Sequence, residues 1–137
     1  MQLSVTDSVT HQDLDEMRLG LNAFNSRFID INEMKAIGVF IKDGAGKKLA
    51  GLTGSTYGNW LRIDMLWVSD ALRGQGAGSQ LIQAAEQEAR ARGCRYAQVD
   101  TASFQARPFY EKLGYTLRFS LDHYPREHQR HYLSKTL

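Results

Sequence analysis

The chain has 137 residues, 42% of them hydrophobic and 23% charged, which is ordinary for one compact globular domain. Seventeen basic residues against fifteen acidic ones give a formal net charge of only +2, so we expect no extended basic surface for nucleic acid or a membrane. A single cysteine, Cys94, excludes an internal disulfide, and nothing resembles an export signal or the roughly 20 apolar residues of a membrane span. We therefore expect a cytoplasmic protein with a single domain over residues 1–137.

The first half of the chain predicts one helix followed by three antiparallel strands. Residues 12–28 carry apolar side chains three and four positions apart, the spacing of an amphipathic helix. Residues 37–41 and 49–52 flank a glycine-containing turn and predict a hairpin. A second turn containing glycine leads into a third strand over residues 60–68.

Residues 75–92 predict a second helix, because the apolar pattern changes to a helical period. Its expected buried stripe consists of Gly78, Leu81, Ile82, Ala85 and Ala89. Two ion pairs, Glu86–Arg90 and Glu88–Arg92, are expected on its solvent-facing side. Gly93 would end the helix in a left-handed conformation.

The last part of the chain predicts a strand over residues 95–101, a short helix over 105–113, and strands over 115–121 and 131–133. Strand, helix and strand from residue 60 to 101 form a parallel unit with a crossover connection. The predicted class is therefore α+β, with a mixed, mostly antiparallel sheet around a central parallel βαβ unit.

A glycine-rich turn, Arg73-Gly-Gln-Gly-Ala-Gly-Ser79, connects the third strand to the second helix. Three glycines in five positions let backbone N–H groups converge, and the helix N-terminus adds to their attraction for phosphate. Ser79 directly follows Gly78, so the turn lacks the Gly-Lys-Ser/Thr ending of a Walker A loop. Ser79 also stands where the dinucleotide fingerprint has its third glycine. An anion cradle of another kind and a surface turn without ligand remain as interpretations.

Two segments resemble the signatures of the Gcn5-related N-acetyltransferase (GNAT) superfamily, and of a small bacterial subgroup within it. Residues 73–78 match Arg/Gln-x-x-Gly-x-Gly/Ala, and residues 106–115, Ala-Arg-Pro-Phe-Tyr-Glu-Lys-Leu-Gly-Tyr, are similar to Ala-x-x-x-Tyr-Glu-Lys-Leu-Gly-Phe. The resemblance implies the GNAT fold and transfer of acetyl from acetyl-CoA to a primary amine of a small molecule or protein, by direct attack in a ternary complex. It also implies a homodimer, which no residue of the sequence establishes.

The same resemblance implies where acetyl-CoA binds. Its pyrophosphate would lie on the backbone amides of Arg73, Gly74, Gln75, Gly76, Ala77, Gly78 and Ser79, and its pantetheine would pair along Leu66, Trp67 and Val68. A backbone N–H near the end of that strand would stabilise the charge that develops on the thioester oxygen. Ser103 stands where many relatives have asparagine, so a contact to the CoA arm is either lost or made by its hydroxyl group.

Tyr110 is the candidate acid that protonates the departing thiolate of CoA, because a phenol donates a proton without being ionised at neutral pH. The alternative is a core tyrosine that packs beside Phe109. The family motif has a tyrosine at this position, which favours the catalytic role.

The attacking amine must lose a proton, and Asp64 is the leading candidate for the base. It stands in an otherwise apolar strand, where a carboxylate is costly without a partner or a function. The alternative is a structural pair with a neighbour such as Arg62. Asp100 and Glu33 are weaker candidates.

Histidines are concentrated near the C-terminal end, where His128 and His131 have a spacing that could suggest a metal. Residues three apart in a strand point to opposite faces and no cysteine is near, so we predict no metal site. His128 is expected in a loop that forms a wall of the acceptor site, where it would accept a proton or position the substrate. A solvated hairpin loop is the alternative.

Four aromatic residues, Tyr57, Trp60, Trp67 and Phe104, fall near the expected cleft, and core packing is their usual explanation. Two other functions compete with acetyl transfer. A catalytically silent acyl-CoA-binding or sensing domain would need only the glycine-rich turn. A nucleic-acid-binding module would use the basic C-terminal end, but the net charge of +2 disfavours it.

Overall fold

The computed structural model describes all residues from 1 to 137 and divides them into two compact units, residues 1–33 and 34–137. The expectation of a single domain over the whole chain stays a prediction.

Residues 1–33 contain helix α1 (His11–Asn25) and a 3-10 turn, η1 (Ile31–Glu33). A reciprocal capping box starts α1: the Thr10 hydroxyl accepts from the Asp13 N–H, and the Asp13 carboxylate accepts from the Thr10 N–H, each at 3.0 Å. The predicted extension of this helix to Phe28 is wrong, because a turn follows α1 directly. No residue of α1 is buried.

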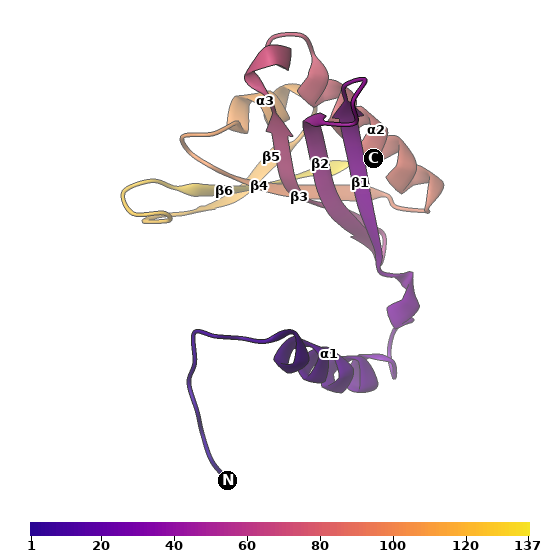
Figure 1. Ribbon diagram of the computed structural model, residues 1–137, viewed down its shortest axis with the longest axis vertical. Coiled ribbons are helices and arrows are strands. Elements are labelled where there is room, and N and C mark those ends of the chain that lie inside the picture. The colour runs from indigo at the N-terminus through magenta and orange to yellow at the C-terminus, as the bar shows by residue number, and fades with distance from the viewer. The chain divides into compact units, whose positions relative to one another are not determined.

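Residues 34–137 form a six-stranded sheet in the order β1-β2-β3-β4-β6-β5. The strands are β1 (Lys35–Lys42), β2 (Lys48–Tyr57), β3 (Trp60–Val68), β4 (Tyr96–Ala102), β5 (Thr116–Leu121) and β6 (Arg130–Thr136). Neighbouring strands are antiparallel except β3 and β4, which are parallel and are connected through η2 (Asp70–Leu72) and α2 (Ala77–Ala91) (Figure 1). The predicted α+β class with a central parallel unit is confirmed.

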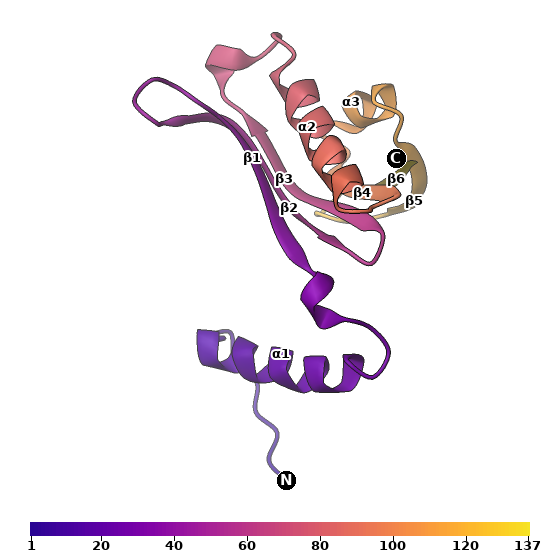
Figure 2. The ribbon, with the colours of Figure 1, turned by 90° about the vertical axis from the view of Figure 1, so that its right-hand side faces the viewer.

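Helix α2 packs on the face of β1, β2 and β3, and the short helix α3 (Arg107–Lys112) lies on the same face of the sheet (Figure 2). The core lies between the sheet and α2, with Leu81 and Ile82 of the helix against strand residues such as Leu52, Leu61 and Ile63, all of them buried. Burying such side chains contributes about 1.5–3 kcal/mol each. Gly93 follows α2 with φ of 91°, as predicted for the end of this helix.

The predicted outward pair Glu86–Arg90 is wrong, because Glu86 is only 3% exposed. It lies four residues after Ile82 and therefore on the buried face of α2. Tyr115 donates a hydrogen bond to its carboxylate at 2.8 Å, and the Lys135 ammonium lies at 3.0 Å. The predicted Glu88–Arg92 pair is present at the surface, with 3.7 Å between the charged atoms.

Strands β3 and β4 pair only along residues 60–63 and 96–99, and then they separate. The separation begins at a bulge in β3, where Asp64 has no partner residue on β2. Gly54 of β2 faces this bulge, and a Cβ atom at position 54 would lie 2.0 Å from the carbonyl oxygen of Arg62. Only glycine allows β2 to stay paired with a bulged β3 at this point.

We expect Gly54→Ala to destabilise the protein by about 1–3 kcal/mol, because the added methyl group would meet backbone, which cannot move aside as a side chain can. Gly44→Ala is the matched control, since no atom lies within 4 Å of a Cβ there. Urea unfolding of both variants measures the difference in the free energy of unfolding. Equal stability of the two would show that the bulge tolerates a side chain at position 54.

Candidate active site

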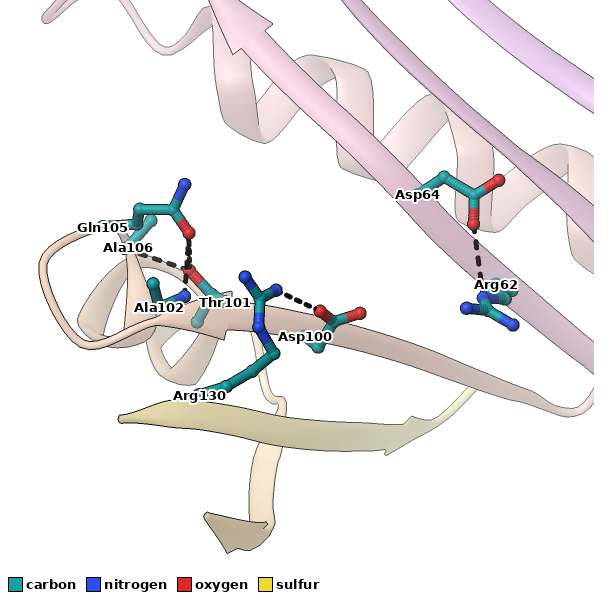
Figure 3. A network of polar contacts seen from close by, with 8 residues as sticks. All are labelled: Arg62, Asp64, Asp100, Thr101, Ala102, Gln105, Ala106 and Arg130. Atoms are coloured by element: carbon teal, nitrogen blue, oxygen red, sulfur yellow. Dashed lines mark hydrogen bonds and ion pairs between the residues drawn. The ribbon is translucent and has the colours of Figure 1, made fainter. Parts of the chain in front are cut away.

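A pocket of about 360 Å³ occupies the opening between β3 and β4. Figure 3 shows Asp64 on β3 and Asp100 on β4, on the two strands that diverge. Tyr110 of α3 also lines this pocket. The opening therefore brings together the predicted acid, the predicted base and one weaker candidate.

Tyr110 is 5% exposed, and its ring packs edge-on against Phe109 and Tyr115, with ring centres 5.1 and 5.9 Å apart. Its hydroxyl group has no hydrogen-bond partner within the protein, unlike that of Tyr115. Burial, together with the negative charge of Asp100, raises the pKa of Tyr110 to about 12. Tyr110 is thus both a core ring and a neutral phenol whose proton is not committed to another residue.

Helix α3 is fixed at its start by polar contacts with the end of β4 (Figure 3). The Gln105 side-chain oxygen accepts hydrogen bonds from the Ala102 N–H at 2.8 Å and from the Thr101 hydroxyl at 3.4 Å. The Thr101 hydroxyl in turn accepts from the Ala106 N–H at 3.3 Å. These contacts position Tyr110. Sequence reasoning missed them because a glutamine in a predicted helix carries no sign that it caps a strand end.

The Asp64 side chain is 49% exposed, because it lies with Arg62 on the face of β3 opposite buried Ile63. Its carboxylate lies 3.3 Å from the Arg62 guanidinium (Figure 3). The structural pair is therefore present, although Asp64 also lines the pocket. Its role as base stays a prediction.

Asp100 forms a second ion pair in the opening, with Arg130 of β6 (Figure 3). Both side chains are partly buried, and the Arg130 guanidinium also stacks over the Tyr124 ring at 4.7 Å. A carboxylate held in this way is less available as a base than Asp64. Sequence reasoning did not single out Arg130 for this role.

His128 does not line the pocket in the opening. It lies beside Glu127 at 3.4 Å, with its ring edge-on to Phe104 at 4.8 Å between ring centres. The Ser103 hydroxyl accepts a hydrogen bond from the Gln129 N–H at 3.1 Å and so fixes the same loop. Trp67 and Phe104 are exposed, so core packing is the wrong explanation for these two aromatic residues.

The glycine-rich turn presents backbone donors that the protein does not use. Gly74 and Gly76 have φ angles of 76° and 78°, in the left-handed region that favours glycine. The unpaired N–H groups are those of Gly74, Gly76, Ala77, Gly78 and Ser79. They surround the N-terminus of α2, whose dipole favours an anion.

The other predicted residues of the turn have separate roles. Arg73 pairs with Asp70 at 3.0 Å, and both side chains are exposed, so its charge stays near the turn. The Gln75 side chain donates a hydrogen bond to the Ala71 carbonyl at 3.0 Å. A Cβ atom at Gly78 would lie 3.1 Å from the Phe109 ring, so this glycine also allows α2 and α3 to approach closely.

The second half of β3 has one free edge. Leu66, Trp67 and Val68 pair with β2 on one side, and because β4 has separated, no strand pairs with them on the other. Their free backbone groups are suited to an extended ligand that adds to the sheet, as the resemblance to the GNAT superfamily implies for pantetheine.

A larger pocket of about 710 Å³ adjoins the first one and shares Ile63, Val99 and Asp100 with it. Arg62 and Gln98, which alternate with buried core residues on β3 and β4, also line it, so it lies on the sheet face away from α2.

None of the helices has the length and apolar character that a membrane span requires. No group of three or more histidine, cysteine or acidic residues is arranged to hold a metal ion.

Comparisons with known proteins agree with this geometry. The model of the acetyltransferase (GNAT) family matches residues 9–115. Blasticidin-S acetyltransferase from Streptomyces morookaense is 44% identical over 93 residues, which cover 67% of this chain and 68% of that protein. An acetyltransferase structure from Bacillus cereus superposes with a TM-score of 0.82 at 31% identity, covering 98% of both chains.

At the level of the fold alone, an aminoglycoside 6'-N-acetyltransferase in complex with coenzyme A superposes with a TM-score of 0.66 at 18% identity, covering 99% of this chain and 97% of that one. The family match, the relatives and the separated strands all lead to the assignment that the two sequence signatures predict. The chain belongs to the GNAT family of acetyltransferases.

Proposed function

We propose that the protein transfers the acetyl group of acetyl-CoA to a primary amine of a small molecule, with both substrates bound at once. The observation that carries this proposal is the opening between β3 and β4, which has Tyr110 at its wall and adjoins a separate pocket on the other sheet face. A pocket of about 710 Å³ is within the range of small-ligand sites. The similarity to blasticidin-S acetyltransferase also supports a small-molecule acceptor.

The chain has groups that fit each part of the donor. The free amides of Gly74 and of residues 76–79 would hold the pyrophosphate, and the free edge of β3 from Leu66 to Val68 would hold the pantetheine. When bound, acetyl-CoA supplies the activated acetyl group. A free N–H on the same edge of β3 would stabilise negative charge on the acetyl oxygen.

Two side chains would handle the protons. Tyr110 would donate its proton to the departing sulfur, which is consistent with a hydroxyl group that has no other partner. Asp64 is exposed at the opening and would take the proton of the amine, directly or through water. Asp100 is already paired with Arg130 and would fix the position of the Arg130 guanidinium in the opening.

Acetyl-CoA is expected to raise the melting temperature, because a ligand that binds only the folded state stabilises it by about 2.7 kcal/mol at 100 times its Kd. Gly76→Asp should abolish this shift, since it adds a side chain and a negative charge to the anion cradle. Gly46→Asp is the matched control, because Gly46 also has a positive φ and open space but lies in the β1–β2 turn.

Thermal melts with acetyl-CoA and with ATP measure the shift for all three proteins. An equal shift with ATP, or an undiminished shift in Gly76→Asp, would contradict the proposed donor site. Release of free thiol with blasticidin S and a panel of small amines then tests transfer itself.

A further inference from the structure

Strand β5 contains a bulge that changes which side chains face the larger pocket. Leu117 is opposite Leu133 and Phe119 is opposite Tyr132, which leaves Arg118 without a partner residue on β6. In a regular strand Arg118 and Phe119 would point to opposite faces. Here both line the pocket. The bulge therefore adds one cation and one aromatic ring to the same wall.

Arg118 has no carboxylate partner, in contrast to the other arginines near the two pockets. Arg62 is paired with Asp64, and Arg130 with Asp100, whereas Arg118 donates only from its Nε to the Ser134 hydroxyl at 2.6 Å. That contact fixes the guanidinium and leaves its two terminal nitrogens free. A planar guanidinium held in this way fits a carboxylate or phosphate group, which accepts two parallel hydrogen bonds.

The rings of Phe119 and Tyr132 lie next to Arg118 in the pocket wall and stack on each other. Their ring centres are 4.6 Å apart and their planes differ by 13°. Phe119 is 52% exposed, so a large apolar surface meets solvent within the pocket. Exposed aromatic surface inside a concave site is typical of a binding site for a planar group.

We propose that the amine acceptor also carries a planar ring and an anionic group, the ring lying against Phe119 and Tyr132 and the anion bound by Arg118. This inference rests on the proposed function and names its substrate class. Arg118 lines the larger pocket but not the opening that holds Tyr110. The anion therefore lies at a distance from the reacting amine, at the far side of the ring, and an α-amino acid, whose carboxylate is next to its amine, does not fit.

Four probes separate these features. In 4-(aminomethyl)benzoate and 4-(aminomethyl)phenylphosphonate an amine and an anion lie at opposite ends of a ring. The neutral 4-(aminomethyl)benzamide lacks the charge, and 4-(aminomethyl)cyclohexanecarboxylate lacks the planar ring. Equilibrium binding is measured by NMR titration in the presence of CoA, so the result does not depend on turnover.

We expect at least one anionic benzyl probe to bind about 10- to 100-fold more tightly than the benzamide, in line with a charge-assisted bidentate contact. The carboxylate and the phosphonate show which anion is preferred. Arg118→Gln should remove this preference without changing the affinity for the benzamide. Arg90→Gln, on the exposed side of α2, should leave all the affinities unchanged. Equal binding of charged and neutral probes, or a preference that survives Arg118→Gln, would overturn the anion site.

The ring is tested in the same titrations. The cyclohexane probe should bind several-fold more weakly than the benzoate, and Phe119→Ala should remove that difference. Equal affinities for the two in the native protein would overturn the aromatic platform. Thiol release with acetyl-CoA is measured on the same samples. Selective binding without thiol release would contradict the proposed acetyl transfer but would still support the proposed binding of the ring and the anion in the larger pocket.

Discussion

Tyr110→Phe is expected to slow acetyl transfer by about 10- to 1,000-fold while the affinity for acetyl-CoA changes little. Phenylalanine keeps the ring that packs against Phe109 and Tyr115 but removes the proton donor. Because the Tyr110 hydroxyl has no partner in the protein, its loss leaves no buried group unpaired, and stability should stay within about 0.5 kcal/mol. A fall in kcat at constant donor affinity indicates a contact made in the transition state.

Tyr115→Phe is the matched control, since the two rings touch and only one is predicted to act in catalysis. Tyr115 donates to buried Glu86, so its replacement should cost stability and leave kcat near the native value. Steady-state kinetics and thermal melts on both variants give the comparison. Full activity in Tyr110→Phe would assign the acid role to water or another residue.

The raised pKa of Tyr110 also makes a prediction for pH. With a value of about 12, caused mainly by burial, the phenol stays protonated across the range in which amine acceptors lose their protons. The rate should therefore rise with pH as the amine becomes neutral. At any pH below about 11, ionisation of Tyr110 should not reduce the rate. A fall near pH 9 that is absent in Tyr110→Phe would contradict this.

Glu86→Ala is expected to lower the free energy of unfolding by about 3 kcal/mol, the largest loss of stability we expect from a single residue here. The substitution would leave the Lys135 ammonium without its partner and the Tyr115 hydroxyl without its acceptor. Lys135 keeps some access to water, which limits the cost. Removing one partner of a buried ion pair costs more than the pair itself contributes, because the remaining charge is poorly solvated.

Glu88→Ala is the control on the same helix. Glu88 is half exposed and its pair with Arg92 is a surface contact, so this substitution should cost less than about 1 kcal/mol. Urea unfolding of both variants measures the difference. Similar losses would show that Glu86 and Lys135 find other partners when separated.

Much of the fold could be predicted because the local patterns were consistent. Apolar segments joined by glycine-containing turns predicted β1 to β3, and the helical stripe with Gly93 predicted α2. Glu86 was misassigned because its place on the helix was judged by charge, whereas its partners Tyr115 and Lys135 lie 29 and 49 residues later. Such long-range pairs leave no local trace in the sequence.

The site was predicted in part. The glycine-rich turn and Tyr110 fall in recognisable motifs; the turn leads into α2, and Tyr110 lines the opening between β3 and β4. The bulge at Asp64 was not predicted, because a bulge cannot be inferred from an apolar run alone. The glycines of β2 were the feature of the sequence that could have indicated the bulge, because Gly54 permits it. The second bulge, at Arg118, has no comparable glycine opposite it and could not be found from the sequence.

One sheet separates the core beneath α2 from the larger pocket, and this has a consequence for how the sequence of such a protein can change in evolution. Where β3 and β4 are paired, Arg62 and Gln98 face the pocket on one side of the sheet, while the residues that flank them are buried in the core beneath α2. Neighbouring codons are therefore under different selective constraints. Mutations at every second position can change the preferred acceptor while the intervening positions preserve folding and the donor site, so new substrate ranges can be reached in small, independent steps.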